Sequence, residues 1–552
     1  MPANVRISFR SGTQKIYPAR TTVAEIVNDP EVGDLGSPIV GALVNNELVC
    51  LSSEVEVDSH LEAVGLQSRE GTYIYRRSLC LLLAMATAGL ASRRRLVISH
   101  SLGDGYFYYF DGLDHIPDQE LDLIRRQMRR LVAADVAFTA GYVSYLDALR
   151  YFEENNQRDT VMLLENANEA KVRIYRCGDF IDLYHGPLVP SSGILKEFQI
   201  MNYPPGFLLR FPQRQGKIGA FAKRPLLFAI YREYKSWGKI LNVSCAGRLN
   251  QLVREGQIDD FVQVSEALHD KKIARIADMI TQQRCHIRVV LVAGPSSSGK
   301  TTFSKKLAIQ LRVLGRNPIT VSLDDYFLPR DLSPRDEAGN YNFEDLEALD
   351  IELLNAHLVA LLDGLAVSVP RFDFRSGTRR TDERLFALPE RGVLIIEGIH
   401  GLNEELTPSL ERKQKFKIYV SALTQLNLDD HNRISTTDNR LLRRVVRDNQ
   451  FRGHPAQRTL NMWPSVRRGE DRNIFPFQDS SDAVFNSALD YEHTVLRVFA
   501  EPLLRTVRPD ARVYQEARRL LTFLGNFAPL SPSWVPSRSI LREFIGGSAF
   551  RY

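Results

Sequence analysis

The sequence predicts an α/β protein whose C-terminal half is a parallel sheet with helices on both faces. Three short aliphatic runs, 289–292, 318–323 and 393–396, have the length and the β-branched content of buried strands. Helical periodicity separates these runs, as the crossover connections of a parallel sheet require. The residues before 286 follow shorter patterns, which predict two smaller α+β domains and a helical connector.

Length and composition limit the classes of protein to consider. The 552 residues, 44% hydrophobic and 25% charged, are typical of a globular protein with several domains, which we place at 1–62, 63–225, 226–285 and 286–552. The longest apolar run, 79–91, is shorter than the roughly 20 residues of a membrane span. The first residues show no apolar secretory signal. We therefore expect a cytoplasmic protein with no membrane contact.

The charge and the cysteines agree with a cytoplasmic protein that binds a phosphorylated ligand. A formal charge of +5 suits such a ligand but is too small to indicate nucleic acid by itself. The cysteines are widely spaced and form no CxxC pair, which favours reduced thiols over disulfides or a zinc site. They are Cys50, Cys80, Cys177, Cys245 and Cys285.

Residues 1–62 predict short strands around one helix. VRISF, at 5–9, reads as a strand, TTVAEIV, at 21–27, as a helix, and IVGALVNNELVCL as a hairpin that turns at Asn45 and Asn46. With KIYPARTTVAEIV, this order resembles the TGS domain, a small ubiquitin-like α+β module. The resemblance implies that this part binds a partner or RNA and carries no chemistry.

Two further segments carry a second resemblance. ISHSLGDGYFYYF, at 98–110, precedes a helix with apolar residues at 121, 124, 128 and 131, and VRIYRCGDFIDLYHGPLVPSSG follows at 172–193. Residues 63–225 thereby resemble the editing domain of threonyl-tRNA synthetases, their second additional domain. The resemblance implies an α+β fold.

The polar ligands of that editing family are missing here. Its HxxxH pair and its Cys and His fall on Arg77, Leu81, Tyr184 and Leu188. Without an imidazole or a thiolate at these positions there is no ligand set for Zn²⁺ and no base for deacylation. Two histidines survive nearby, His100 and His185, but lone histidines are more often structural. We expect a binding or regulatory domain that has kept the fold and lost the chemistry.

Residues 226–285 predict amphipathic helices that connect the two halves. Apolar residues at 273, 276, 277 and 280 follow helical spacing, and 249–253 does the same.

The strand at 289–292 runs into a phosphate-binding loop (P-loop), which matches the pattern GxxxxGK[ST]. Its glycines permit the backbone angles that turn successive N–H groups towards a phosphate, and the following helix adds its positive end. Lys300 would reach the outer phosphates and Thr301 would bind Mg²⁺. The alternative is a small-residue loop that merely caps a helix. The predicted nucleotide-binding residues are Gly294, Pro295, Ser296, Ser297, Ser298, Gly299, Lys300, Thr301 and Thr302.

Two further strands end in carboxylates. Asp324 follows the strand 318–323, and Glu397 follows the strand 393–396 in a Walker B arrangement. At the carboxyl edge of a parallel sheet Asp324 can accept a proton from an attacking hydroxyl and contact Mg²⁺, while Glu397 holds Mg²⁺. The alternative for Asp324 is a helix cap.

An aromatic segment lies between these strands. Phe372 and Phe374 flank Asp373, and Arg379 follows. Aromatic faces beside a carboxylate and a guanidinium could sandwich a base and bind ribose hydroxyls. They could equally be core aromatics with a solvated charge between them.

A late helix carries an arginine stripe. Arg440, Arg443, Arg444 and Arg447 share one face of the helix 438–448, with aliphatic residues on the other, and Arg452 follows. Such a face predicts a lid that closes on a polyphosphate. A solvated basic face or a patch for RNA is the alternative.

Together these motifs resemble the uridine kinase and phosphoribulokinase family over roughly 288–505. They are GPSSSGKTT, SLDDYF, NYNFEDLEALD, VPRFDF, LIIEGIHGL and DNRLLRRVVRD. The resemblance implies a P-loop kinase fold, ATP as donor and Mg²⁺. It places the catalytic base on Asp324, the metal ligands on Thr301 and Glu397, and the arginines of the lid on Arg444, Arg447 and Arg452. It places base and ribose contacts near Tyr326, Phe372 and Phe374. We expect Lys300, Arg444 and Arg447 to act as catalytic cations, Arg452 to contact the nucleotide and Asp324 to contact the metal as well.

Two positions depart from that family and concern the acceptor. Gly377 stands where uridine kinases carry a base-contacting histidine, and His454 replaces their second distal lid arginine. The end of the chain, 539–552, is expected to dock elsewhere on the molecule.

The order of the modules resembles multidomain bacterial nucleoside kinases, and we expect phosphorylation of the 5′-hydroxyl of a nucleoside, uridine or cytidine first. One alternative is a kinase of another hydroxyl, such as that of a sugar phosphate. Another is an RNA-associated regulator that uses the P-loop as a nucleotide switch. We expect a homo-oligomer, and RNA or a regulatory ligand as partner of the N-terminal modules. The sequence does not separate ATP from GTP.

Overall fold

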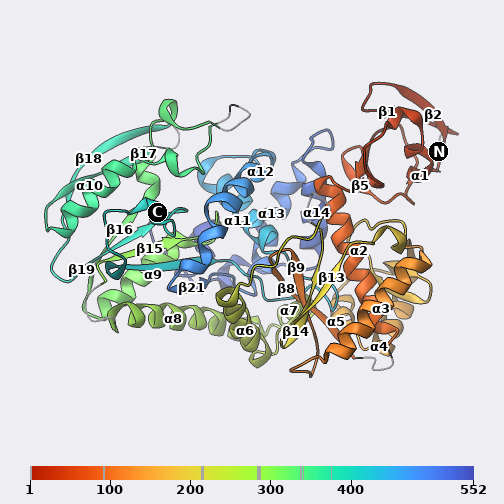
Figure 1. Cartoon of the computed structure of the whole chain (residues 1–552), viewed down its shortest axis with the longest axis horizontal. Coiled ribbons are helices and arrows are strands. Elements are labelled where there is room, and N and C mark those ends of the chain that lie inside the picture. Colours follow the sequence, from red (N-terminus) through yellow and green to blue (C-terminus); the bar gives the residue numbers. More distant parts are fainter. Residues whose placement is uncertain are drawn as a thin grey trace.

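The computed structural model describes residues 3–90, 94–212, 217–282, 287–335, 339, 341–373 and 376–551. Figure 1 shows a small N-terminal sheet at one end of the molecule and a larger parallel sheet at the other, with helices between them. Across these ranges no helix combines the length and the apolar content that a bilayer span needs.

The N-terminal sheet has five strands in the order β2-β1-β7-β4-β5. Asn45 and Asn46 have φ values of 50° and 60°, which is the conformation of the tight turns that suit a two-residue hairpin. The strands and helix are β1 (Asn4–Phe9), β2 (Gln14–Pro18), α1 (Val23–Val27), β4 (Ile39–Val44), β5 (Glu47–Val49) and β7 (Ser59–Gly65), with a separate pair of β3 (Thr21–Thr22) and β6 (Glu54–Val55).

The second part packs two antiparallel sheets with helices. The sheet orders are β13-β14-β9-β8 and β10-β11-β12. Its long helix α2 (Arg69–Ala88) contains most of the apolar run of the sequence, and Leu79, Leu82 and Leu83 are fully buried. The other elements are β8 (Leu96–Leu102), β9 (Gly105–Phe110), α3 (Asp118–Ala134), β10 (Thr139–Ser144), α4 (Tyr145–Glu154), α5 (Arg158–Glu165), β11 (Lys171–Cys177), β12 (Phe180–Leu183), β13 (Gln199–Tyr203) and β14 (Gly206–Arg210).

Three helices connect the halves: α6 (Pro225–Ile240), α7 (Ala246–Arg254) and α8 (Ile258–Gln282). The apolar residues predicted at helical spacing in α8 are buried in the core of the C-terminal, kinase-like half, which begins at about residue 286. Ile273 and Ala277 among them are fully buried. The connector is therefore packed into that half along its apolar face.

The C-terminal half is an α/β layer structure with a parallel sheet in the order β16-β19-β15-β20-β21. Alternate residues of β15 enter two different cores: Val290 and Val292 face one, Val289 and Leu291 the other. Helices therefore cover both faces of the sheet. The strands are β15 (Val289–Ala293), β16 (Asn317–Ser322), β19 (Gly392–Glu397), β20 (Lys415–Ser421) and β21 (Ala483–Asn486).

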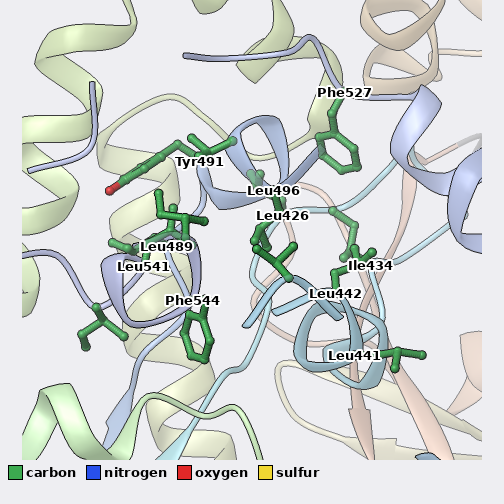
Figure 2. Packing of buried hydrophobic residues seen from close by; sticks show 14 of the residues in the cluster. Leu426, Ile434, Leu441, Leu442, Leu489, Tyr491, Leu496, Phe527, Leu541 and Phe544 are labelled. Atoms are coloured by element: carbon green, nitrogen blue, oxygen red, sulfur yellow. The ribbon is translucent and has the colours of Figure 1, made fainter. Parts of the chain in front are cut away.

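The remaining elements surround this sheet. The helices are α9 (Lys300–Val313), α10 (Ile351–Leu362), α11 (Thr436–Arg452), α12 (Ala456–Asn473), α13 (Glu492–Arg505), α14 (Tyr514–Gly525) and α15 (Arg542–Ile545), and a hairpin is formed by β17 (Val367–Asp373) and β18 (Thr378–Phe386). Figure 2 shows that side chains from α11, α13 and the C-terminal segment pack in one cluster, including Leu442, Leu496 and Phe544.

The segment from β20 to α11, residues 421–435, joins the two halves, and we call it the docking loop. Its residues 421–431 are all buried. Asn427 donates to the carbonyl of Ile98 at 2.7 Å, and the backbone of Ile98 donates to the carbonyl of Asp430 at 3.0 Å. A loop of the kinase-like half thus lies inside the N-terminal half.

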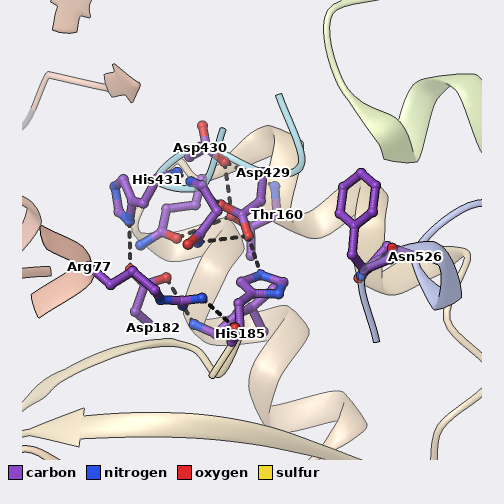
Figure 3. A network of polar contacts seen from close by, with 12 residues as sticks. Arg77, Thr160, Asp182, His185, Asp429, Asp430, His431 and Asn526 are labelled. Carbon is purple, nitrogen blue, oxygen red and sulfur yellow. Dashed lines mark hydrogen bonds and ion pairs between the residues drawn. The ribbon is translucent and has the colours of Figure 1, made fainter. Parts of the chain in front are cut away.

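Charged side chains of the docking loop are paired across this junction (Figure 3). Asp429 accepts from His185 at 2.7 Å, and His431 contacts Asp182 at 2.9 Å. Asp430 pairs with Arg95 at 2.6 Å. Because a buried charge without a partner costs several kcal/mol, these contacts fix the halves relative to each other.

His431 predicts a pH dependence of stability. Burial alone would lower its pKa, but Asp182, with Asp430 and Asp429, raises the pKa of His431 to about 9. The folded pKa lies above the unfolded one, so the stabilisation is complete below about pH 6.5 and is lost as the pH rises through about 9. We expect the free energy of unfolding to fall by up to about 3 kcal/mol over this window.

The measurement is urea unfolding at several pH values for the native chain and for His431→Gln. The variant should lack the pH-dependent part, while the exposed His60→Gln should keep it. Identical pH profiles for the native chain and His431→Gln would contradict the assignment.

Candidate active site

The P-loop lies where β15 ends and α9 begins, at the carboxyl edge of the parallel sheet. Ser297 and Gly299 have φ values of 60° and 81°, in the left-handed region that turns the backbone N–H groups inward. A Cβ at Gly299 would lie 2.5 Å from Ile540, and one at Gly294 only 2.1 Å from the carbonyl oxygen of Val420. Close packing therefore requires a glycine at both positions, and at Gly299 the positive φ favours one as well.

The two strand-end acids lie beside this loop. β19 pairs with β15 on one side and with β16 on the other, so Glu397, Asp324 and the P-loop share one edge. The Thr301 hydroxyl donates to Glu397 at 3.0 Å. Ser322 donates to the same carboxylate oxygen at 3.4 Å. The structure thus brings together the three residues predicted to hold Mg²⁺.

The electrostatics of these acids would suit a bound cation. Burial raises the pKa of Glu397 to about 7, with Lys300 opposing the rise and Asp324 adding to it. Burial also raises the pKa of Asp324, against Lys300, Arg452 and Arg447. Buried carboxylates whose ionised forms are disfavoured, next to a hydroxyl, form an oxygen ligand set that suits a divalent ion. The residues present therefore fit Mg²⁺.

The arginines of α11 fall into two groups, which have different partners. Arg440 pairs with Glu470, with one contact at 2.8 Å, and donates to the carbonyl of Ser296. Arg443 pairs with Glu492 at 2.6 Å and donates to the carbonyl of Ser297 at 3.4 Å. Both arginines are buried, at 1% and 0% exposure. They hold the outer side of the P-loop and are not free to meet a phosphate.

The other three arginines gather around Asp448. Arg444 and Arg447 pair with it at 3.2 Å and 2.9 Å, and Arg452 at 3.5 Å. Arg444 also donates to the Ser296 hydroxyl at 2.8 Å. The aliphatic residues on the other side of α11 are buried as well. The structure thus shows α11 as a core helix, whereas its arginine stripe predicted a lid that closes on a polyphosphate.

A residue that sequence reasoning did not single out is Glu344. Burial raises its pKa to about 7, with Arg444 opposing the rise and Asp324 among the groups that add to it. The carboxylate therefore lies within the electrostatic reach of the site. In the sequence, Glu344 could have been found through its place in NYNFEDLEALD, a motif to which no role was assigned for this residue.

The predicted acceptor residues are spread over separate contacts. Tyr326 is buried and its hydroxyl contacts His357 at 3.0 Å. Phe372 packs against Phe327 with 5.7 Å between ring centroids. The other members pair elsewhere or lie outside the described residues: Arg379 with Asp350 at 2.7 Å, Asp373 with Arg380 at 3.9 Å, and Phe374 undescribed.

The C-terminal segment docks on the P-loop helix. Glu543, in α15, accepts from the backbone N–H of Thr302 at 3.0 Å and from its hydroxyl at 2.6 Å. Ile540 lies against Gly299, and Lys305 donates to the carbonyl of Arg551. A carboxylate therefore accepts from one of the amides predicted to bind a phosphate, which no local sequence pattern had indicated.

The positions that correspond to the editing ligands hold no metal-binding side chains. Leu81 and Leu188 are buried apolar residues, and Arg77 donates to the Tyr73 hydroxyl at 3.2 Å. Burial lowers the pKa of His100 to about 3, and its ring stacks on Tyr231. Within the described ranges no three His, Cys, Asp or Glu side chains gather as a metal site.

Comparison with known families assigns the C-terminal half. Residues 289–492 match the model of the "Phosphoribulokinase / Uridine kinase family". This range contains the P-loop, both strand-end acids and α11. Over these residues the C-terminal half is similar to the kinases of this family, and its parallel α/β sheet agrees with that similarity.

The N-terminal part is similar to another class of protein. The threonine–tRNA ligase of Desulforamulus reducens is 30% identical over 199 residues, which are 36% of this chain and 31% of the ligase. That of Thermotoga sp. is 29% identical over 201 residues, 36% of this chain and 30% of the ligase. The chain thus spans less than a third of the length of these relatives.

One solved structure, described as a possible uridine kinase from Bacillus stearothermophilus, is 20% identical. It aligns with 36% of this chain and 89% of its own, with a TM-score of 0.24.

The buried pair of Arg443 and Glu492 predicts a stability effect. Arg443→Met leaves the Glu492 carboxylate buried without its cation, and we expect a loss of about 3–5 kcal/mol in the free energy of unfolding. Arg505→Met, which breaks the exposed pair with Glu501, should cost less than about 1 kcal/mol.

Both variants can be compared by urea unfolding. Combining Arg443→Met with Glu492→Leu should recover much of the loss, because no unpaired charge is left. A single variant as stable as the native chain would mean that the pair does not support the loop.

Proposed function

We propose that the C-terminal half phosphorylates the 5′-hydroxyl of a nucleoside, with uridine or cytidine as first acceptor, ATP as donor and Mg²⁺ as cofactor. The observation that carries this proposal is the convergence of Thr301, Glu397, Asp324 and Lys300 at one sheet edge. In a nucleotide switch no residue has to accept a proton from a second substrate. Here a half-buried carboxylate, Asp324, lies within the electrostatic reach of the P-loop lysine.

Each residue has a defined role in this proposal. Asp324 accepts the proton of the acceptor hydroxyl, and its raised pKa brings its basicity closer to that task. Lys300 and Arg447 offset the charge that develops on the transferred phosphoryl group. Thr301 and Glu397, with Asp324, would hold Mg²⁺, which supplies charge neutralisation at the outer phosphates when bound.

A kinase of another hydroxyl is the second candidate, and the acceptor side supports it. Gly377, in place of the histidine expected of uridine kinases, lies at a turn with φ of 72°, where a Cβ would be 2.7 Å from Arg330. A histidine would not fit this turn without a shift of Arg330. The acceptor pocket therefore differs from the one that the resemblance implies.

An RNA-associated regulator is the third candidate. It is supported by the similarity of the N-terminal part to threonine–tRNA ligases. This candidate requires tight RNA binding with steep salt dependence and no acceptor-dependent consumption of ATP.

One experiment separates the three. ADP release is measured with the full-length chain across nucleosides and sugar phosphates, with and without Mg²⁺. Stimulation by uridine or cytidine supports the first proposal, and stimulation by another alcohol alone supports the second. Release that no acceptor stimulates would overturn both kinase proposals.

Asp324→Asn should reduce turnover by about 100-fold or more, because the amide cannot accept the proton. The affinity for ATP, measured by calorimetry, should stay within about twofold, since the P-loop contacts are untouched. The exposed Asp331→Asn serves as the matched control and should keep native turnover. Near-native activity of Asp324→Asn would show that the base lies elsewhere.

Glu543→Gln should strengthen ATP binding by about three- to tenfold. The carboxylate accepts from the Thr302 N–H, so it competes with a phosphate for the donors at the start of α9 and repels it. Calorimetry with ATP gives the dissociation constant, and the exposed Glu411→Gln is the control. Weaker binding in Glu543→Gln would indicate that this contact supports the nucleotide site.

A further inference from the structure

A cavity of about 2560 Å³ lies between the two halves, far larger than the roughly 300–1,000 Å³ of a typical small-molecule pocket. Its described lining includes fourteen arginines, no lysine and seven acidic residues. The cavity is therefore strongly basic, although the chain as a whole carries only +5. An anionic ligand would bind where this positive charge has no counterion within the protein.

Half of the cavity arginines form ion pairs with carboxylates of the described residues. Arg519 pairs with Asp438 at 2.7 Å, and Arg467 with Glu470 at 2.8 Å. Arg224 pairs with Asp479 at 2.6 Å. These pairs lie along the α12 and α14 sides of the cavity. That part of the lining is not a continuous track of free cations.

Two partly buried arginines differ from these. Arg77, from α2, and Arg433, from the docking loop, form no ion pair with any carboxylate that the structure describes. The Nε–H groups of both are buried and donate to no described acceptor. A guanidinium that is withdrawn from water without an anion costs several kcal/mol, so both groups are short of a partner.

The two arginines line the same part of the cavity. Arg77 donates to the carbonyl of His185, and the ring of His185 contacts Asp429 at 2.7 Å, four residues before Arg433 in the docking loop. Both arginines also oppose the rise that burial causes in the pKa of Cys80. The Arg77 guanidinium lies 5.7 Å from the Tyr73 ring centroid and that of Arg433 lies 5.1 Å from the Tyr106 ring. Aromatic faces hold the guanidinium groups in place and leave their N–H edges to a ligand.

A third arginine stands at the exposed mouth of this region. Arg173 lies 3.7 Å from the ring centroid of Tyr184. Burial raises the pKa of Tyr184, and both Arg173 and Arg77 oppose the rise.

The nearest acids are already engaged. Asp182 contacts His431 at 2.9 Å and Asp429 contacts His185 at 2.7 Å (Figure 3). In the same view Arg77 points to the carbonyl of His185 and not to a carboxylate. Two histidines thus take up the acids that would otherwise neutralise the arginines.

We propose that Arg77 and Arg433, with Arg173 at the mouth, form a binding site for the phosphate group of a small phosphate monoester. Two guanidinium groups match the charge of a phosphate dianion, and their planar donor edges match its oxygens. An extended RNA strand would need a row of free cations along the cavity, and the pairs of Arg519, Arg467 and Arg224 interrupt such a row. The site uses one residue from each half and exists only when the halves are docked.

The site is independent of the kinase proposal. Arg433 stands two residues before Ser435, which caps α11, whose arginines hold the P-loop. A ligand at Arg433 would therefore contact the segment that leads into the kinase core without entering the P-loop.

Calorimetry on the full-length chain tests the site, with Lys300→Ala in every sample to weaken phosphate binding at the P-loop. The probes are uridine monophosphate, inorganic phosphate, uridine and a short single-stranded RNA. We expect the monophosphate to bind, uridine not to bind, and Arg77→Gln or Arg433→Gln to weaken binding by about tenfold or more. Arg254→Gln, an exposed arginine of the same cavity, should leave the affinity unchanged.

Urea unfolding of each variant shows whether the junction is intact. If Arg433→Gln unfolds, Arg433→Lys keeps the charge without the planar fork and should weaken binding by about threefold or more. Binding of inorganic phosphate alone would support the site and assign it to the free ion. No binding of either phosphate probe, binding that none of these variants changes, or binding of RNA alone would overturn the proposal.

Discussion

The geometry of this protein depends on the docking loop. Asp429, Asp430 and His431 are buried charges in a segment of the kinase-like half, and their partners lie in the N-terminal half. Separating the halves would leave these charges unpaired, at a cost of several kcal/mol each. The same segment leads directly into α11. The junction between the halves and the framework of the phosphate loop are therefore parts of one continuous structure.

Carboxylates from distant parts of the chain hold the phosphate loop. Glu470 accepts from the N–H of Ser296 and pairs with Arg440, and although burial alone would raise its pKa, Arg440 and Arg467 lower it. Glu492 holds Arg443, and Glu543 accepts from Thr302. The loop is thus braced from α12, α13 and the C-terminal segment, and the N–H groups of Ser296 and Thr302 donate to carboxylates that a phosphate would have to displace.

The sequence allowed the fold class and the sheet-edge residues to be predicted because these depend on local patterns. An aliphatic run that ends in Asp324 or Glu397 shows both the strand and the position of the acid. The role of α11 could not be predicted in this way. Its arginine stripe resembles a ligand-binding face, and only the fold brings Glu470 and Glu492, 30 and 49 positions later, against it. The contacts of Glu543 and the cavity arginines depend on tertiary packing for the same reason.

The docking of the C-terminal segment has a consequence for how the chain is made. Leu541 and Phe544 belong to the core of the kinase-like half, and Ile540 covers Gly299. These residues are translated after the phosphate loop, and Thr302 and Glu543 are 241 positions apart. Until the later segment has left the ribosome, an apolar surface of the core stays uncovered and this part of the fold cannot be completed.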